Sequence, residues 1–342
     1  MPKVHCYTSA TFSYLDRVRV LAQSVKKHHP DWEFSLCLCD KPPPGTSFDI
    51  GEEPIDHLID ILDLDIENIQ SWIFRHNIVE LCTAVKGIVL ERLLQTDCEF
   101  VVYLDPDIAI FDALTEVEES IRNHSVILTP HQLTPEPSHD IQAIIDNEIG
   151  SLKYGIYNLG FITVVNDAEG RRFASWWKNR LLSFCFDDLA NGLFTDQKWC
   201  NHIPSFFDRV CILKHPGYNV ASWNLSQRLV TIDAGGDILI NTCRLKFFHF
   251  TKVNWIGEVM LERYCRDRIE IFELMLWYRR ELRANAFVGL PNIWWHYGSF
   301  SDGKPVLQKH RDKYRSDSYL NSKSMNPYDH SDLFWGSDLD LT

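Results

Sequence analysis

Two aspartates, spaced two residues apart, carry the strongest chemical signal in the sequence. Phe100-Val-Val-Tyr-Leu104 is an apolar run, and Asp105-Pro-Asp107 follows it directly. Pro106 fixes its own φ and biases Asp105 toward an extended backbone. Two carboxylates at the carboxyl end of a buried strand suit a hard divalent cation, whose remaining ligands would be phosphate oxygens and one further protein group. The alternative is an acidic turn that does no more than solvate the end of the strand.

A lysine upstream of this pair is the second candidate. Lys86 lies in a helix predicted over residues 77–95, inside the apolar face and near its edge. That face is formed by Ile78, Cys82, Val89 and Leu93. A lysine in this position either extends along the surface into solvent or reaches toward an anion such as a diphosphate. The motifs around it favour the second interpretation.

Polar residues also accompany two later segments. Asn158 offers a donor and an acceptor, and Gly160 permits close approach of a ligand, just before a strand predicted over 161–165. Asp196 and Gln197 place a carboxylate beside a carboxamide in a loop. This pair suits sugar hydroxyls or a reacting anomeric centre, but Asp196 or Thr195 could equally cap a short helix.

The last candidates surround a strand predicted over 245–249. His249 ends this strand, where a histidine is either a core residue or a ligand, and Lys252 suits a phosphate contact. The aromatic segment Trp294-Trp-His-Tyr-Gly298 indicates either packing or an acceptor platform.

Strands and helices alternate through the first two-thirds of the chain, and these elements must position the polar residues. Strands are predicted over 3–7, 34–39, 100–104, 125–129, 161–165 and 245–249, with helices up to 29, over 67–95 and over 168–185. This alternation predicts an α/β fold with an open, mostly parallel sheet and helices on both faces, in which ligands bind beyond the carboxyl ends of the strands. A long helix is expected over about 258–282, before a polar tail.

Composition limits the classes of partner. The chain has 34 basic and 47 acidic residues, a net charge of −13, so a nucleic-acid surface is not expected, and a polyphosphate ligand would need a local cation. The ten cysteines form no CxxC pair and are interpreted as buried reduced thiols. No signal peptide and no run of 18 apolar residues is evident. We therefore expect a cytoplasmic protein without a transmembrane segment, with peripheral membrane contact left open.

The ordered set of these motifs resembles the family 8 glycosyltransferases, the group that contains glycogenin and bacterial lipopolysaccharide galactosyltransferases. The resemblance runs from Val4 to about Trp255. It is carried by Thr8-Ser-Ala-Thr-Phe12, Thr83-Ala-Val-Lys86, Tyr103-Leu-Asp-Pro-Asp107, Tyr157-Asn-Leu-Gly160, Asp196-Gln197 and His249-Phe250. It implies a GT-A (nucleotide-diphospho-sugar transferase) domain over 1–257, and a helical and irregular extension over 258–342 that packs on this domain.

The resemblance also implies the cofactor and the donor. The ion would be Mn²⁺ or Mg²⁺, with Asp105, Asp107 and His249 as its ligands, and the donor would be a UDP-sugar. Asp105 would also approach the donor's ribose or sugar. Lys86 and Lys252 would face the phosphates.

The remaining roles follow from the same resemblance. The uracil and ribose would lie against Thr8, Ser9 and Ala10. The sugar pocket and the reacting centre would be formed by Asn158, Asp196 and Gln197. The implied reaction is transfer of a hexose to a glycan or lipid-linked acceptor with retention of anomeric configuration.

Two other classes of function remain open from the residues. A nucleotidyltransferase would use a related sheet, but it usually has a Gly-rich phosphate loop after the first strand, and residues 8–13 contain no glycine. A non-catalytic carbohydrate-binding or scaffold protein on the same fold would lack a metal ligand or have an occluded donor site.

Overall fold

A seven-stranded sheet forms the centre of the molecule in the computed structural model, which describes residues 3–251, 256–265, 267–291, 294–322 and 326–335. Its strand order is β10-β6-β7-β4-β1-β2-β3. The strands are β1 (Val4–Ala10), β2 (Glu33–Leu38), β3 (His57–Asp60), β4 (Phe100–Leu104), β6 (Val126–Pro130), β7 (Tyr157–Val165) and β10 (Val210–Ile212). Strands β4, β1, β2 and β3 run parallel, as do β10 and β6, whereas β7 runs antiparallel between β4 and β6. The predicted α/β fold with a mostly parallel sheet is confirmed.

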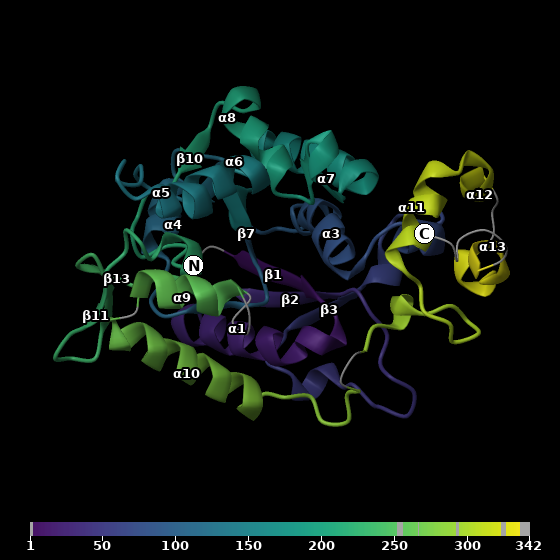
Figure 1. The fold of residues 1–342 in the computed structure, drawn as a ribbon, viewed down its shortest axis with the longest axis horizontal. Coiled ribbons are helices and arrows are strands. Elements are labelled where there is room, and N and C mark those ends of the chain that lie inside the picture. The colour runs from purple at the N-terminus through teal and green to yellow at the C-terminus, as the bar shows by residue number, and fades with distance from the viewer. Residues whose placement is uncertain (1–2, 252–255, 266, 292–293, 323–325, 336–342) are drawn as a thin grey trace.

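Helices cover both faces of this sheet (Figure 1). Helix α1 (Leu15–His28) lies on one face, and α3 (Ile78–Leu93) and α7 (Ala168–Phe184) lie on the other. Because strand side chains alternate between faces, Tyr7 and Tyr103 enter the core beneath α3 and α7, whereas neighbouring strand residues enter the core beneath α1. The sheet is therefore buried on both sides.

The remaining elements are short. The helices are α2 (Ile69–Phe74), α4 (Thr115–Ser120), α5 (Ile141–Ala143), η4 (Ile144–Ile149), α6 (Gly150–Tyr154), η6 (Lys198–His202), α8 (Ile203–Phe206) and η7 (Ser222–Asn224). A three-stranded sheet contains β11 (Val230–Ile232), β12 (Ile238–Ile240) and β13 (Cys243–Arg244). A two-stranded sheet contains β8 (Asp187–Asp188) and β9 (Leu193–Phe194).

Helix α3 begins at a capping box. The Asn77 side chain accepts hydrogen bonds from the N–H groups of Val79 and Glu80, and the Glu80 carboxylate accepts one from the Asn77 N–H at 2.9 Å. Close packing follows further along, because a Cβ added to Gly87 would lie 2.7 Å from the Cα of Lys178 in α7. The predicted apolar stripe is only partly right, because Ile78 and Cys82 are half-buried, whereas α3 as a whole is buried on most of its circumference.

Two strands extend further than predicted, in both cases through polar residues. Strand β1 continues to Ala10 instead of ending at Tyr7, and β7 begins at Tyr157 instead of at Phe161. Residues 8–10 pair in parallel with 36–38 of β2, so the ladder overrides the turn preference of Thr8 and Ser9. These polar strand ends lie at the carboxyl edge of the sheet, where the candidate site is found.

The C-terminal third is helical but not one continuous rod. Helix α9 (Ile256–Cys265) and α10 (Ile269–Ala284) replace the single helix predicted over 258–282. Arg268 fixes the corner between them, because its guanidinium donates to the carbonyls of Leu225 at 2.8 Å and Arg228 at 3.1 Å. Within the described ranges, no helix combines the length and the apolar content that crossing a bilayer requires.

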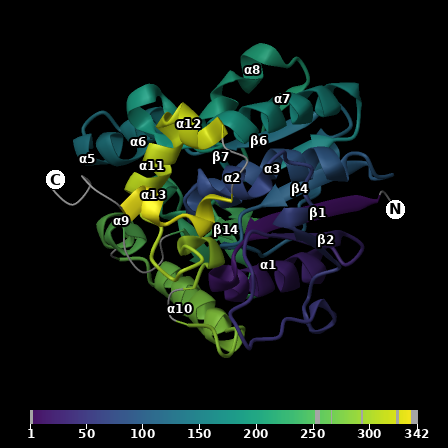
Figure 2. The same ribbon diagram turned by 90° about the vertical axis from the view of Figure 1, so that its right-hand side faces the viewer.

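The last helices lie at one end of the sheet beside α2 (Figures 1 and 2). They are α11 (Gln308–Ser316), α12 (Ser318–Ser322) and α13 (Asp332–Trp335). The buried guanidinium of Arg311 joins them to the rest, donating to the carbonyls of Phe74 at 2.9 Å and Tyr297 at 2.8 Å. The domain boundary after residue 257 stays a prediction. All ten cysteines are free, and seven are buried, as the sequence indicates.

The aromatic segment near residue 295 packs against the end of β2. The Trp294 indole donates to the carbonyl of Lys41 at 2.8 Å, and the Trp295 indole donates to that of Cys39 at 3.3 Å. The buried Asp40 carboxylate accepts from the His296 N–H at 2.8 Å. Of the two interpretations left open by the sequence, the described contacts of these indoles are those of packing.

Asp40 makes this contact sensitive to pH. Burial raises the pKa of its carboxyl to about 6, although three backbone N–H groups oppose that shift. An unfolded aspartate titrates near pH ~3.9, so between these values the folded protein binds more protons than the unfolded chain, and stability falls as pH rises.

We expect the free energy of unfolding of wild type, relative to Asp40→Asn, to fall by about 2 to 3 kcal/mol from pH 4 to 7. Urea titrations across this range measure it. Parallel pH profiles for the two proteins would contradict it, and Asp312→Asn, at an exposed carboxylate, is the control.

Candidate active site

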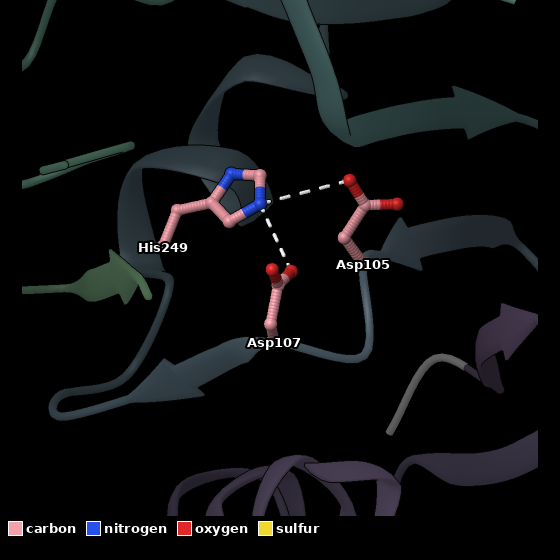
Figure 3. A group of neighbouring side chains, drawn as sticks. All are labelled: Asp105, Asp107 and His249. Carbon is pink, nitrogen blue, oxygen red and sulfur yellow. Dashed lines mark ion pairs between the residues drawn. The ribbon is translucent and has the colours of Figure 1, made fainter. Parts of the chain in front are cut away.

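Three side chains that the sequence singles out converge at the carboxyl edge of the sheet. Asp105 follows β4, Asp107 precedes β5 (Ile108–Ile110), and His249 ends β14 (Phe247–His249) (Figure 3). The Nε2 atom of His249 lies 3.0 Å from Oδ1 of Asp107 and 3.7 Å from Oδ2 of Asp105. One donor atom from each residue lies within 4.8 Å of the others. Residues more than 140 positions apart in sequence thus form one cluster.

Backbone pairing holds this cluster in place. Strands β5 and β14 are antiparallel, with His249 opposite Ile108, so the histidine stands beside the aspartate turn. The turn is closed by the Ile108 N–H, which donates to the Asp105 carbonyl at 3.1 Å. The Asp105 N–H donates to the carbonyl of Gly160 at 2.8 Å, which ties the turn to β7. Pro106, at the centre of the turn, has no backbone N–H and therefore leaves no donor that needs a hydrogen-bond partner there.

Charge interactions set the protonation of the cluster. Burial opposes a charged imidazole at His249, but the carboxylates of Asp107 and Asp105 outweigh it, so the pKa of His249 is raised. Burial likewise opposes ionisation of Asp107, but the charge of His249 outweighs it and lowers the pKa of Asp107. The two carboxylates thus favour positive charge at the imidazole, and a cation bound between these groups would compete with a proton on His249.

The donor set fits a divalent cation. Two carboxylates and one imidazole suit a first-row ion such as Mn²⁺, since carboxylates favour hard cations and imidazole favours transition metals. The side chain of Asp105 is 25% exposed, against 14% for Asp107 and 5% for His249, so the cluster opens on the Asp105 side. Further ligands, such as phosphate oxygens, have access from that side.

Asn158 links the histidine to the predicted sugar pocket. Its Oδ1 atom lies 3.2 Å from Nδ1 of His249, and its Nδ2 atom lies 3.4 Å from Oε1 of Gln197. If His249 held a cation through Nε2, Nδ1 would carry the proton and donate to Asn158, and this bond would fix the orientation of the ring. Gln197 is held by the Leu159 N–H at 3.1 Å and by its own bond to the Tyr154 carbonyl at 3.2 Å. Asn158 and Gln197 are therefore part of one hydrogen-bonded unit with the cluster.

Lys86 lies at the centre of a second set of contacts. Its Nζ atom is 3.1 Å from Oδ1 of Asp105 and 2.9 Å from Oδ2 of Asp196, and it donates to the Leu159 carbonyl at 3.0 Å. The side chain is buried, so the alternative of a lysine extending into solvent is wrong. Burial would lower the pKa of Lys86, but the two aspartates outweigh it and raise the pKa. In this structure Lys86 pairs with carboxylates, and its predicted contact with phosphates stays a prediction.

Asp196 does not cap a helix. The following helix η6 has Gln197 at its N-cap position and no side-chain cap, so that alternative from the sequence is wrong. Burial raises the pKa of Asp196, although Lys86 opposes the shift. Thr195 adds a hydrogen bond to Asp196 Oδ1 at 3.1 Å. The carboxylate is thus held toward Lys86 in the interior.

The three predicted nucleotide contacts on β1 divide between the two faces of the sheet. The Ser9 hydroxyl donates to the carbonyl of Cys82 at 2.6 Å and lies 3.3 Å from the Tyr103 hydroxyl, on the α3 side. Thr8 and Ala10 alternate with it and face the other side, where Ala10 joins the core beneath α1. Thr8 Oγ1 has no hydrogen-bond partner in the described part of the chain. Lys252 lies outside the described residues.

The sequence interpretation missed three residues that contact the site. The Tyr103 hydroxyl donates to Asp105 Oδ1 at 2.7 Å, and its ring lies 4.2 Å beneath the Lys86 ammonium. His131 Nε2 lies 3.2 Å from Asn158 Nδ2, and Trp223 packs edge-on against His249 with ring centroids 5.3 Å apart. Tyr103 could have been found, because positions two apart on a strand share a face. No motif or spacing around His131 or Trp223 in the sequence indicates that either residue contacts the site.

Gly160 is required by the closeness of His249. A Cβ at this position would lie 2.5 Å from Cε1 of His249 and 2.8 Å from Oδ1 of Asn158. Gly160→Ala should displace the imidazole and weaken Mn²⁺ binding by about 10- to 100-fold, the range seen when groups that orient metal ligands are removed. Titration with Mn²⁺ followed by electron paramagnetic resonance measures this. Gly150→Ala, with no atom within 4 Å of the new Cβ, should bind as wild type does. Equal affinity for Gly160→Ala would contradict the geometry.

A cavity of about 790 Å³ lies elsewhere, between α1 and α10, and is lined by Val20, Phe111 and Trp277 among others. It contains none of the candidate site residues. The cluster at the carboxyl edge is therefore recognised by its chemistry and not by the size of a cavity.

Comparison with known proteins gives distant similarities. No family model matches the chain. The chain is similar to the uncharacterized protein YfnF of Bacillus subtilis (strain 168), with 29% identity over 174 residues, covering 50% of this chain and 56% of YfnF. It is also similar to the uncharacterized protein YfnD of the same strain, with 22% identity over 278 residues, covering 79% of this chain and 84% of YfnD. The first match thus spans little more than half of that relative.

Two solved structures are similar at low identity. One is the galactosyltransferase LgtC in complex with donor and acceptor sugar analogues, with a TM-score of 0.49 and 15% identity, covering 84% of this chain and 98% of LgtC. The other is an active-site mutant of LgtC, with a TM-score of 0.42 and 16% identity, covering 76% and 94%. Similarity of this size assigns neither a family nor a function to the chain.

Proposed function

We propose that the chain is a GT-A-type glycosyltransferase that moves a hexose from a UDP-sugar to a glycan or lipid-linked acceptor, with retention of anomeric configuration. One observation carries the proposal: Asp105, Asp107 and His249 bring their donor atoms within 4.8 Å of one another at the carboxyl edge of an α/β sheet. The order of motifs along the chain supports the same class. A bound Mn²⁺ or Mg²⁺ would act there as a Lewis acid that neutralises the leaving diphosphate.

The residues of the chain supply orientation around that centre. Lys86 holds Asp105 and Asp196 in fixed positions through its two ion pairs. Asn158 holds His249 and Gln197 through its amide. In the proposed reaction, Asp196 and Gln197 contact the sugar, and Lys86 compensates the charge that Asp105 and Asp196 would otherwise present to an anionic donor.

The two alternatives make different predictions. A non-catalytic scaffold protein would lack a metal ligand, whereas all three proposed ligands are present and lie together. A nucleotidyltransferase would release pyrophosphate from a nucleoside triphosphate and a sugar phosphate. The two activities are therefore separable by their products.

Donor hydrolysis tests the proposal without knowledge of the acceptor. The protein is incubated with Mn²⁺ and a panel of UDP-, GDP-, ADP- and dTDP-sugars, and the free sugar and nucleoside diphosphate are quantified. We expect release of UDP from one or more UDP-hexoses, abolished by EDTA and by Asp107→Asn. Hydrolysis that persists in EDTA, or release of pyrophosphate from UTP and a sugar phosphate instead, would refute the proposal.

A further inference from the structure

A row of large apolar side chains lies exposed on the segment between β6 and β7. Helices α5, η4 and α6 form one continuous helical segment over residues 141–154. The exposed fractions are 61% for Ile141, 48% for Ile145, 50% for Ile149 and 67% for Leu152. Their spacing of four, four and three residues places them on one face, over roughly 17 Å at 1.5 Å per residue. We call these four residues the apolar row.

The opposite face of this segment is firmly anchored. Asn147 is buried, and its amide donates to Glu136 at 2.7 Å and to Ser226 at 3.1 Å. The Asp146 carboxylate accepts from the Tyr264 hydroxyl at 2.8 Å and pairs with Arg263, both in α9. The segment also includes a π-helical turn at 144–149, an irregularity that is frequent at functional sites. The outward direction of the apolar row is therefore fixed by contacts and does not result from fraying.

The segment ends at the candidate active site. The Tyr154 carbonyl accepts from Gln197 Nε2 at 3.2 Å, and a Cβ added to Gly155 would lie 3.0 Å from Gln197 Cγ. The chain then passes through Ile156, which is also exposed, to Asn158 in β7. A molecule lying along the apolar row would thus have one end beside Gln197.

We propose that the apolar row binds the apolar chain of the acceptor substrate, an amphiphile whose hydroxyl-bearing head reaches Gln197. This inference rests on the proposed function and selects the lipid-linked class of acceptor. The row is continuous with the site through Tyr154 and Gly155, so head and chain are bound by adjoining parts of one surface. Burial of the exposed isoleucine and leucine side chains against the chain supplies the binding free energy.

Two other occupants fit the row less well. A bilayer surface usually attracts a helix with basic residues on its polar side. This segment instead carries Asp146 and Glu148 against Lys153, with Asp140 at its N-cap, in a protein of net charge −13. A second copy of the chain would need roughly 20 to 30 residues on each side for a stable interface. The apolar row contains only four residues. An individual amphiphile matches its size.

Binding of n-dodecyl maltoside below its micelle-forming concentration tests the inference in the full-length protein loaded with Mn²⁺ and UDP. We expect saturable binding by calorimetry, no binding of maltose, and binding weakened about 10-fold or more by Ile145→Ser/Leu152→Ser. Both positions are exposed, so the fold is expected to persist. The matched control, Ile269→Ser/Val288→Ser, removes apolar side chains that are 68% and 90% exposed elsewhere and should bind as wild type does.

Transfer assays add a readout of the acceptor role. Methyl and dodecyl glycosides of the same sugars are compared as acceptors. Wild type should prefer the dodecyl compounds about 10-fold in kcat/KM, and Ile145→Ser/Leu152→Ser should remove this preference.

No saturable binding, or equal binding by the double variant, would overturn the inference. So would self-association, or binding to phosphatidylcholine vesicles, that the double variant abolishes. Donor hydrolysis without acceptor separates the two proposals: its absence refutes the proposed function, whereas its presence without any alkyl-chain dependence refutes only this inference.

Discussion

Asp107→Asn should reduce sugar transfer and metal-dependent donor hydrolysis by about 10³-fold or more. The substitution keeps the size of the side chain and removes one of two carboxylates that converge on His249. A carboxamide oxygen binds a divalent cation more weakly than a carboxylate does, so the charge of a leaving diphosphate would be left largely uncompensated. Stopped assays of UDP release at saturating Mn²⁺ give the rate for each protein.

The fold should survive this change. The Asp107 side chain is 14% exposed, and its charge helps to raise the pKa of His249, so replacing it leaves a neutral amide beside an imidazole with a lower pKa. We expect the midpoint of thermal unfolding to move by only a few degrees. Asp312→Asn, at an exposed carboxylate in α11, is the matched control and should leave the rate unchanged. A rate for Asp107→Asn within a factor of about three of wild type would contradict the role of this residue.

Lys86→Met should lower the free energy of unfolding by about 3 to 5 kcal/mol. The substitution removes the buried cation between Asp105 and Asp196, and it leaves the buried Asp196 carboxylate and the partly exposed Asp105 carboxylate without a compensating charge. Removing one partner of a buried ion pair lowers the free energy of unfolding by far more than the intact pair contributes to it, because an uncompensated charge remains. Urea unfolding at neutral pH measures the effect.

A double variant identifies the cause. Lys86→Met/Asp196→Asn also removes the charge of the more buried carboxylate, and it should recover part of the lost stability while transfer stays low. Lys178→Met breaks a more exposed pair with Glu91 and should cost about 1 kcal/mol or less. If Lys86 serves mainly as a phosphate contact, Lys86→Met would instead keep its stability and lose only donor affinity. That outcome would overturn the positioning role.

The main elements of the fold could be predicted because their apolar patterns are strong. The strand over Phe100–Leu104 and the helix over residues 168–184 lie almost where the pattern places them. The errors fall at polar strand ends, as at Thr8–Ala10 and Tyr157–Gly160, where the ladder of a central sheet overrides local preference. The apolar periodicity of the C-terminal region predicts one continuous helix. It gives no sign that Arg268 bonds to the carbonyls of Leu225 and Arg228 at the corner between α9 and α10.

The candidate site could be predicted in part for a related reason. Asp105 and Asp107 follow a buried strand, a local signal, and the resemblance supplied His249 from far along the chain. The pairing of Lys86 with Asp105 and Asp196 depends on three segments meeting in space, and no local spacing reveals it. The same holds for Trp223 against His249. Contacts of this kind, between residues far apart in the sequence, are thus visible only in the folded structure.

Calorimetric titration of the protein with UDP, in Mn²⁺ and in EDTA, beside Asp107→Asn, tests whether the cluster of Asp105, Asp107 and His249 is a metal-dependent donor site. We expect saturable binding in Mn²⁺ that falls at least about 100-fold in EDTA and in the variant, because two aspartates would bind a diphosphate only through a cation. Binding of UDP with equal affinity in Mn²⁺, in EDTA and by the variant would contradict a metal-dependent donor site at Asp105, Asp107 and His249.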